Sequence, residues 1–414
     1  MNSSTTEPCS NALITLESAL GQILAMLDPL GNDEQVHLKS ALGRVLAEDI
    51  IAPLPLPPFT NSAMDGYALP LQGLRLEQPL TVVGKAMAGH PHSGNVQPGQ
   101  CVRIFTGAPV PAGCEAVIIQ EQVERQGDKI HLRHMPSPGE NIRPAGGDVR
   151  SGEKVLAKGK PLNAADLGLL ASLGVVAVKV FQFPRVAFFS SGDELCPPEQ
   201  PLPPGSIYES NRYSLHGLLA SLPVQATDLD RVKDRLEAIL ERLETAAQTH
   251  DVIISSGGAS VGESDLLGRA LQAVGSMHLW KVAIKPGKPL IFGRIGKAWF
   301  FGLPGNPVSV HVTFTQIVRP ALWKLAGVDS FQALRLPAVC ENDLHKTPGR
   351  LEFQRGHLTQ DATGQVSVFG LSGQGSHQLK SLSQANCFII LPSDSCGIQA
   401  GETVIVEPFE NWIC

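Results

Sequence analysis

Residues Asp251-Val-Ile-Ile-Ser-Ser-Gly-Gly-Ala-Ser-Val-Gly-Glu-Ser-Asp265 predict the central architecture of this chain. The run begins with β-branched residues that are typical of a buried strand. It continues with small residues that let backbone N–H groups approach a ligand, and it ends where a helix is expected to start. This order of strand, glycine-rich turn and helix predicts an anion site within an α/β fold.

Two further turns rich in glycine and proline follow apolar runs. Lys285-Pro-Gly-Lys-Pro289 comes after the strand-like Trp280-Lys-Val-Ala-Ile284, and its prolines hold two ammonium groups near each other. Gly302-Leu-Pro-Gly-Asn-Pro307 ends the aromatic strand 298–301 and leads into the apolar segment 308–325. We expect the first turn of that segment to direct its positive dipole end to the same place.

The chain around these turns alternates between the periods of strands and helices. Strands are expected at 185–189 and 252–255, and helices at 212–222, at 235–249 and after Gly262. This alternation predicts a parallel sheet covered by helices on both faces.

The flanking segments indicate additional domains. Residues 12–28 predict a helix capped by Thr15, and the proline-rich run 51–58 predicts an extended linker at a domain boundary. Short apolar runs between Gly and Pro from 80 to 156 predict a small β domain. Alternating runs after Ala326 predict a β-rich tail.

Length and charge limit the classes of function. A chain of 414 residues suggests two to four domains, and a net charge of -6 without a basic run argues against nucleic acid or anionic membrane as a partner. No signal peptide or spanning apolar run is visible, so we expect a cytoplasmic protein. The eight scattered cysteines are expected to be reduced.

Four polar turns are expected to converge, because ligands of open parallel sheets bind beyond the carboxyl ends of the strands. The fourth turn, Ser190-Ser-Gly-Asp-Glu-Leu195, follows the strand at 185–189. Backbone donors with Lys285 and Lys288 suit phosphate or another tetrahedral oxyanion. A hard cation such as Mg²⁺ fits the remaining carboxylates, which are Asp193, Glu194 and Asp265. Asp265 taken singly is more typical of a helix N-cap or a first-turn charge, and the coincidence of four turns reverses this preference in favour of the ligand site.

Several longer motifs are distributed over nearly the whole chain. They are Asn61-Ser-Ala-Met-Asp-Gly-Tyr-Ala68, Arg103-Ile-Phe-Thr-Gly-Ala-Pro109, Gly192-Asp-Glu-Leu195, Ser255-Ser-Gly-Gly258, Ser260-Val-Gly-Glu263, Lys285-Pro-Gly-Lys-Pro289, Gly302-Leu-Pro-Gly-Asn-Pro307 and Gln354-Arg-Gly356. With these motifs the chain resembles the bacterial MoeA family of molybdopterin molybdenumtransferases, which is related to the E domains of gephyrin and plant Cnx proteins.

The resemblance implies an α/β plus β fold with four domains. A mixed domain I would comprise 33–51 and 153–183, and an inserted β domain II would comprise 52–152. A central doubly wound α/β domain III, similar to the molybdopterin adenylyltransferases MoaB and Mog, would comprise 12–32 and 184–332. Residues 333–414 would form a C-terminal β barrel. It further implies an elongated homodimer in which the two subunits share the site.

The resemblance also implies the reaction. Adenylylated molybdopterin and molybdate would give molybdenum cofactor and AMP with the help of Mg²⁺. The implied partners are a molybdopterin adenylyltransferase upstream and recipient molybdoenzymes or their chaperones downstream.

Specific residues carry these implied roles. Molybdate would be held by Lys285, Lys288, Arg355 and Ser376. The resemblance also implies catalytic roles for Asp65, Glu194 and Asp265, with Glu194 and Asp265 at the metal, while Glu194 could instead align water. The further substrate-binding residues are Thr106, Asp148, Asp234, Gly257, Gly258, Pro304 and Pro307.

Some of these residues also have a structural interpretation. Asp65 could make an Asx-turn, Asp148 could close the loop at Gly146-Gly147, and Arg355 could pair with Glu352 on a barrel surface. We keep both interpretations open at this stage.

The chain departs from the family pattern at two acidic positions. Thr60 stands where many relatives have aspartate, and Arg235 replaces the second member of an acidic pair whose first member is Asp234. Asp234 is therefore expected either to reach the substrate or to cap the following helix. Two alternative functions stay open, a molybdopterin adenylyltransferase and a non-catalytic dimeric scaffold of the gephyrin type.

Overall fold

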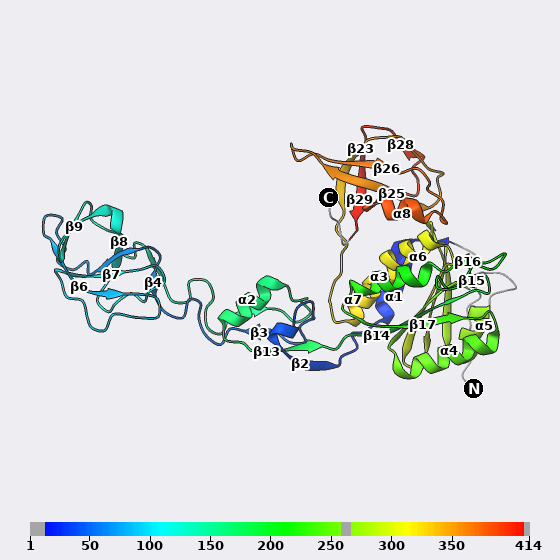
Figure 1. Cartoon of the computed structure of the whole chain (residues 1–414), viewed down its shortest axis with the longest axis horizontal. Coiled ribbons are helices and arrows are strands. Elements are labelled where there is room, and N and C mark those ends of the chain that lie inside the picture. The colour runs from blue at the N-terminus through cyan, green and yellow to red at the C-terminus, as the bar shows by residue number, and fades with distance from the viewer. Residues whose placement is uncertain (1–12, 258–265, 410–414) are drawn as a thin grey trace. The chain divides into compact units, whose positions relative to one another are not determined.

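A computed structural model describes residues 13–257 and 266–409 of the chain (Figure 1). The chain forms two compact units. Unit 1 comprises residues 1–34, 43–45 and 181–414, and unit 2 comprises residues 35–42 and 46–180.

Unit 1 is built on a seven-stranded sheet. The predicted parallel order holds for β22, β18, β14 and β17, whereas β21 runs antiparallel to both of its neighbours. The all-parallel expectation is thus wrong for β21, because the connection 283–288 is too short for the crossover that a parallel neighbour requires. In spatial order the strands are β1 (Leu13–Ile14), β19 (Ser276–Val282), β21 (Pro289–Ile295), β22 (Ala298–Leu303), β18 (Val252–Ser256), β14 (Arg185–Ser191) and β17 (Gln225–Val232).

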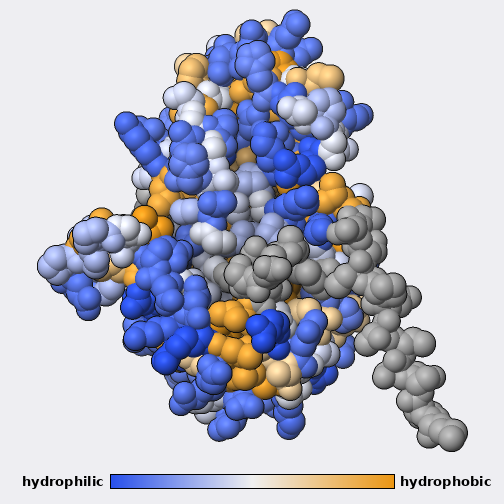
Figure 2. All heavy atoms as spheres, turned by 90° about the vertical axis from the view of Figure 1, so that its right-hand side faces the viewer, coloured by the Kyte–Doolittle hydropathy of each residue, from blue (hydrophilic) through white to orange (hydrophobic). Residues whose placement is uncertain are grey.

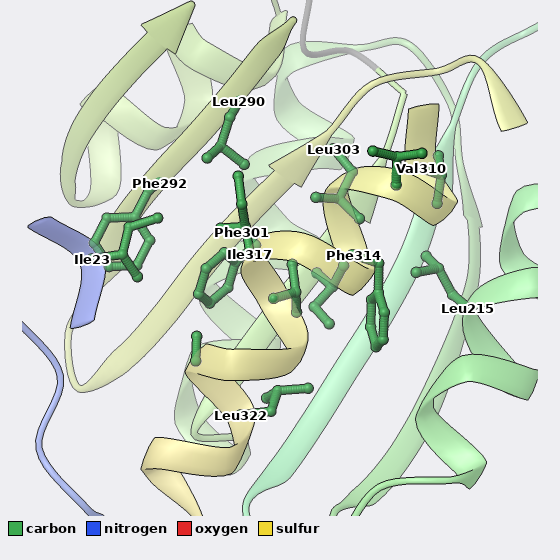
Figure 3. Packing of buried hydrophobic residues seen from close by; sticks show 14 of the residues in the cluster. Ile23, Leu215, Leu290, Phe292, Phe301, Leu303, Val310, Phe314, Ile317 and Leu322 are labelled. Atoms are coloured by element: carbon green, nitrogen blue, oxygen red, sulfur yellow. The ribbon is translucent and has the colours of Figure 1, made fainter. Parts of the chain in front are cut away.

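Helices cover both faces of this sheet, as the alternation predicted. Successive residues of a strand point to opposite faces. Phe188 therefore belongs to the core under α1, α3, α6 and α7, and Phe189 belongs to the core under α4 and α5. Figure 3 shows part of the first core, where Phe292 and Phe301 of the sheet pack near Ile317. The helices are α1 (Leu16–Met26), α3 (Asn211–Ala220), α4 (Leu236–Thr249), α5 (Leu266–Val274), α6 (Pro307–Thr313), the π-helical turn η3 (Phe314–Val318) and α7 (Arg319–Leu325).

The cap of the first helix is as predicted. The side chain of Thr15 accepts a hydrogen bond from the amide of Ser18 at 3.1 Å, and α1 begins at the next residue, Leu16. This bond satisfies one of the amides that the first helical turn leaves without a partner.

The C-terminal part of unit 1 is a closed β barrel. Strands β25, β26, β23, β29 and β27 follow one another, and β27 pairs again with β25, which closes the ring. The short strand β20 of the lysine turn pairs with β25 and joins the barrel to the connection between β19 and β21. The elements are β20 (Ile284–Lys285), β23 (Leu336–Cys340), β24 (Leu344–His345), β25 (Leu351–Gln360), β26 (Val366–Gly370), α8 (Leu379–Gln384), β27 (Cys387–Leu391), β28 (Gly397–Ile398) and β29 (Thr403–Pro408).

Unit 2 contains the small β sheet that the sequence predicted. Its six strands have the order β8, β5, β7, β6, β10 and β9. Two-stranded pairs and one helix complete the unit. The elements are β2 (Asp33–His37), η1 (Leu38–Ser40), β3 (Ile50–Ile51), β4 (Asn61–Ser62), β5 (Gly66–Leu69), β6 (Leu80–Ala86), β7 (Gln100–Ile104), β8 (Ala116–Ile119), η2 (Gln120–Gln122), β9 (Val123–Gln126), β10 (Lys129–Leu132), β11 (Ile142–Arg143), β12 (Lys154–Leu156), α2 (Ala164–Ser172) and β13 (Ala177–Phe181).

Hydrophilic side chains cover most of the face shown in Figure 2, with a hydrophobic area in its lower half. Within the described residues, no helix is long and apolar enough to cross a membrane. The cysteines of this part of the chain are unpaired, namely Cys101, Cys114, Cys196, Cys340, Cys387 and Cys396.

Candidate functional site

Three of the four predicted turns lie in contact at the carboxyl ends of the strands. Gly257 has a φ of +93°, and a Cβ atom at this position would lie 2.4 Å from the carbonyl oxygen of Ser191. A Cβ on Gly305 would lie 3.8 Å from the Cα of Gly257. Only glycine therefore fits at 257, and the ends of β14, β18 and β22 approach one another as expected.

Asn211 ties two of these turns together. Its side-chain amide donates to the Oγ of Ser256 at 2.8 Å and to the carbonyl oxygen of Gly305 at 2.6 Å. Asn211 opens α3, so the helix holds the two turns in register. Sequence reasoning missed this residue, because nothing in the sequence links position 211 to positions 256 and 305.

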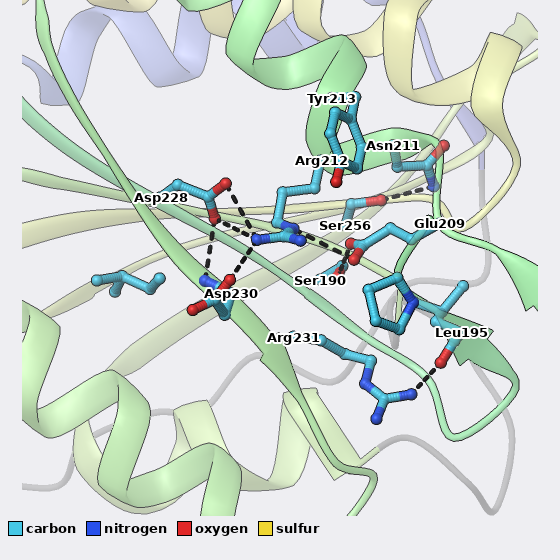
Figure 4. A network of polar contacts seen from close by, with 12 residues as sticks. Ser190, Leu195, Glu209, Asn211, Arg212, Tyr213, Asp228, Asp230, Arg231 and Ser256 are labelled. Atoms are coloured by element: carbon cyan, nitrogen blue, oxygen red, sulfur yellow. Dashed lines mark hydrogen bonds and ion pairs between the residues drawn. The ribbon is translucent and has the colours of Figure 1, made fainter. Parts of the chain in front are cut away.

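The next residue of α3 anchors the same edge of the sheet. Figure 4 shows the Arg212 guanidinium between Glu209 on one side and Asp228 and Asp230 on the other. Glu209 also accepts a hydrogen bond from the hydroxyl of Ser190, at the end of β14. This network, buried at Ser190, Glu209 and Arg212 and exposed at Asp228 and Asp230, fixes the strand ends from which the turns leave.

The remaining predicted turn, 285–289, opens onto a cavity of about 700 Å³, here called the lysine pocket. Its cationic lining consists of Lys281, Lys285, Lys288 and Arg350, and none of the described residues that line it is acidic. The remaining lining residues are Pro286, Gly287, Pro289, Pro304, Gly305, Asn306, Ser309, Gln374, Gly375 and Ser376. The predicted Lys285, Lys288, Pro304 and Ser376 therefore lie around one cavity, whose charge suits an oxyanion.

A carboxylate of the barrel positions Lys285. The Nζ atom of Lys285 lies 3.2 Å from the Oε1 of Glu352, which is its partner in the ladder between β20 and β25. The Glu352 side chain is buried, and its Oε2 has no hydrogen-bond partner among the described residues. Lys285 lines the pocket, and its charge also offsets the desolvation cost of the buried Glu352 carboxylate.

The structure gives Arg355 a position different from the one expected. Arg355 is 1% exposed and does not line the lysine pocket. Its Nη2 donates to the carbonyl oxygens of Gly373 at 2.7 Å and Gly375 at 3.1 Å, so it holds the turn that presents Ser376. Burial lowers the pKa of the Arg355 guanidinium to about 10. The suggested pairing with Glu352 is wrong, because residues three apart on a strand face opposite sides.

Helix α6 meets the barrel at the same place. The amide of Val308 donates to the carbonyl oxygen of Ser376 at 3.0 Å. Pro307 begins α6 and is not among the residues that line the pocket. Lys281 and Arg350 do line it, and sequence reasoning missed both, because only the folded turns bring them beside Lys285.

Acidic residues gather at the ends of β14 and β17. The amide of Asp234 donates to the Oδ1 of Asp193 at 3.3 Å. Burial raises the pKa of the Asp234 carboxyl, and the charges of Asp193 and Glu194 raise it further. We call Asp193, Glu194 and Asp234 the acidic cluster. Helix α4 has Arg235 at its N-cap position, so Asp234 lies one residue outside the cap.

The carboxylates of the acidic cluster suit a hard cation, but the described residues do not supply a complete set of metal ligands. Carboxylate oxygens are ligands that Mg²⁺ prefers, and a divalent cation would offset the repulsion that raises the pKa of Asp234. In the part of the chain that the structure describes, no three acidic, histidine or cysteine residues are arranged to hold a metal ion. The predicted Asp265 and Gly258 lie outside the described residues.

Unit 2 carries the three other predicted residues. The Oδ1 of Asp65 accepts two hydrogen bonds from Thr106, one from its amide and one from its hydroxyl, both at 2.8 Å. These bonds lower the pKa of the Asp65 carboxyl. The carboxylate of Asp65 and the hydroxyl of Thr106 therefore form one local polar site.

The remaining residue, Asp148, is exposed in a separate loop of unit 2. Its amide donates to the carbonyl oxygen of Leu56 at 2.9 Å. The nearby Thr60 accepts a hydrogen bond from the amide of Ala145 at 3.3 Å. The hydroxyl of Thr60 thus ties this loop.

Comparison with known families covers most of the chain. Residues 14–174 match the MoeA N-terminal region (domain I and II), residues 187–324 match a probable molybdopterin binding domain, and residues 337–409 match the MoeA C-terminal region (domain IV).

Individual relatives agree with these matches. A molybdopterin molybdenumtransferase of Haemophilus influenzae is 43% identical over 96% of this chain and 99% of its own length. A gephyrin of Dictyostelium discoideum is 32% identical over 96% of this chain and 62% of its own length. The crystal structure of the molybdopterin biosynthesis moeA protein from Pyrococcus horikoshii OT3 superposes with a TM-score of 0.83 at 32% identity, covering 96% of this chain and 100% of that structure.

Proposed function

The chain belongs to the MoeA family of molybdopterin molybdenumtransferases, enzymes of molybdenum cofactor biosynthesis, and on that premise we propose how it acts. We propose that it inserts molybdate into adenylylated molybdopterin and releases molybdenum cofactor and AMP.

The lysine pocket is the observation that carries this proposal. Molybdate is a tetrahedral dianion, and the described lining of the pocket contains four cationic side chains and no acidic one. Lys285 and Lys288 would bind its oxygens through charge-assisted hydrogen bonds, and Ser376 would add a hydroxyl donor. Arg355 would act indirectly, because it holds the turn that carries Ser376.

The phosphoanhydride of the substrate would lie toward the acidic side of the site. Glu194, with Asp265, would hold Mg²⁺, and Asp193 and Asp234 add negative charge beside it. Bound there, the cation would withdraw charge from the phosphoanhydride as AMP leaves. Glu194 is alternatively suited to align water for the same step. The walls of the substrate-binding site would be formed by Gly257, Gly258, Pro304 and Pro307.

We further propose that Asp65, Thr106 and Asp148 complete the site. They lie in unit 2, so the proposal includes a homodimer in which one subunit provides unit 2 to the unit 1 of the other. The division into domains I to IV at the boundaries given above belongs to the same proposal. The proposal also includes a cytoplasmic location. The chain would receive its substrate from a molybdopterin adenylyltransferase and deliver the cofactor to recipient molybdoenzymes or their chaperones.

The direct test measures AMP. Purified protein is incubated with adenylylated molybdopterin and Mg²⁺, with and without molybdate, and AMP is quantified by chromatography. We expect molybdate to stimulate AMP release, EDTA to stop it, and added Mg²⁺ to restore it. Formation of pyrophosphate from ATP and molybdopterin would indicate an adenylyltransferase instead. Absence of both reactions in a folded dimer would favour a scaffold.

A further inference from the structure

A second basic pocket lies between the edge strand β17 and helix α4, away from the lysine pocket. It has a volume of about 410 Å³. Four cationic side chains line it, Arg231, Lys233, Arg235 and Arg242, together with one acidic side chain, Glu241. We call these residues the edge pocket.

In the part of the chain that the structure describes, the cations of the edge pocket form no salt bridge with a carboxylate. The salt bridges among the described residues involve none of Arg231, Lys233, Arg235 and Arg242. Four like charges around one cavity repel one another, and in a chain of net charge -6 such an arrangement is not a consequence of overall composition. An anion bound among them would relieve the repulsion.

Two of the arginines are held in place by the backbone. Arg231 donates from Nη1 to the carbonyl oxygen of Leu195, as Figure 4 shows, and Arg242 donates from Nη1 to the carbonyl oxygen of Leu229. Each bond uses one of the five N–H donors of a guanidinium, so the head groups are fixed while most donors stay available to a ligand. Lys233 and Arg235 are exposed and flank Asp234 in the chain.

The size and walls of the edge pocket indicate a small ligand. Its volume lies within the range of about 300–1,000 Å³ that is usual for small-molecule sites. An acidic peptide added as a strand along β17 is disfavoured, because Asp230 has a φ of +59° and the register of β17 against β14 shifts at this point. A broken ladder of backbone groups offers no continuous edge for strand addition.

From these observations we propose that the edge pocket is a second oxyanion site, which binds phosphate either as the free ion or as the phosphate group of a nucleoside monophosphate. This site goes beyond the proposed function, because none of its four cations belongs to the residues assigned to the reaction. Arg231 and Arg242 would form its fixed wall, and Lys233 and Arg235 would close on the bound anion.

Phosphate binding by the full-length chain tests the proposal. The Lys285→Ala/Lys288→Ala variant, checked for native circular dichroism, removes the main cations of the lysine pocket. We expect equilibrium dialysis with radiolabelled inorganic phosphate to show retained binding in this variant. Adding Lys233→Glu and Arg235→Glu should then weaken that binding by about tenfold or more, because reversed charges repel the anion. Lys297→Glu is the matched control and should change it by less than about twofold, since Lys297 belongs to the turn between β21 and β22 and does not line the edge pocket.

Parallel dialysis with AMP and adenosine identifies the source of the phosphate. AMP binding tighter than that of inorganic phosphate, with adenosine not retained, identifies a nucleoside monophosphate, and equal binding of AMP and phosphate identifies the ion itself. The proposal is overturned if the Lys285→Ala/Lys288→Ala variant loses all phosphate binding, if Lys297→Glu weakens it as strongly as the edge-pocket changes do, or if a short acidic peptide binds where phosphate does not. AMP release can fail independently of these results, so they do not depend on the proposed reaction.

Discussion

Lys285 and Glu352 face each other across the two-residue ladder between β20 and β25, with Nζ and Oε1 3.2 Å apart. The pair joins the lysine turn of the α/β sheet to the barrel. A residue proposed to hold molybdate is thereby positioned by a buried carboxylate 67 positions later in the sequence.

Replacing Lys285 by alanine should affect stability as well as function. Glu352 would lose its cation and stay buried, which costs about 1–3 kcal/mol for an unsatisfied polar group. We expect Lys285→Ala to lower the melting temperature, and the double variant Lys285→Ala/Glu352→Gln to recover most of the loss. Thermal unfolding followed by circular dichroism measures both. An equal melting temperature for Lys285→Ala and the wild type would contradict the role of the pair.

Lys288→Ala provides the matched comparison in the same pocket. Lys288 is exposed, and no salt bridge among the described residues involves it. We therefore expect the free energy of unfolding to change by less than about 0.5 kcal/mol, as for ordinary surface substitutions. The molybdate concentration that half-saturates AMP release should rise about tenfold, because one charge-assisted bond is lost. An unchanged molybdate dependence would show that the oxyanion binds elsewhere.

Thr106→Val should alter the ionisation of Asp65. The two hydrogen bonds from Thr106 hold the pKa of the Asp65 carboxyl below its ordinary value of 3.8. A group with a lowered pKa stabilises the folded state above pH 3.8, and this contribution is lost as the pH falls through the folded pKa. Valine removes the hydroxyl bond, so the Asp65 pKa should rise toward 3.8 while the amide bond remains. NMR titration of the Asp65 carboxyl measures this shift directly. An unchanged pKa would mean that the Thr106 hydroxyl does not contribute to lowering it.

Asn211→Ala should reduce activity without unfolding the protein. It removes the two bonds that join the turns at Ser256 and Gly305, so the substrate groups between them lose their alignment. A misplacement of about 1 Å can cost on the order of 100-fold in rate. Ser256→Ala removes one bond and keeps the bond to Gly305, so we expect its rate of AMP release to lie between those of the wild type and Asn211→Ala. Equal rates for Asn211→Ala and the wild type would exclude a positioning role.

Asp234→Asn should make stability less sensitive to pH. Burial and the charges of Asp193 and Glu194 raise the pKa of Asp234 above 3.8. The folded state therefore holds this proton more tightly than the unfolded state, and stability is lost as the pH rises from 3.8 through the folded pKa. The variant should be more stable than the wild type at neutral pH and equal to it in acid. Melting curves between acid and neutral pH, each with and without Mg²⁺, test this. A variant Asp234→Asn that is less stable than the wild type at neutral pH would contradict the prediction.

Local sequence patterns predicted those features that depend on neighbouring residues. Thr15 caps α1 because an N-cap bond spans three residues, and the apolar run at 252–256 forms β18 because its side chains suit a buried strand. The turns at Gly257 and Gly305 also meet where the strand order predicted them. The antiparallel direction of β21 was missed, since a short apolar run has the same composition in either direction.

The sequence by itself determined the alternation of strands and helices, the glycine turns at the strand ends and the presence of two lysines in the turn 285–289. The tertiary structure alone decided which distant residues share a cavity. It brought Arg350 and Ser376 of the barrel to the lysine turn, bonded Arg355 to the turn that carries Ser376, and placed four cations around the edge pocket. The physical reason is that propensity and periodicity act over a few residues, whereas cavities and ion pairs depend on how strands pair across the whole chain.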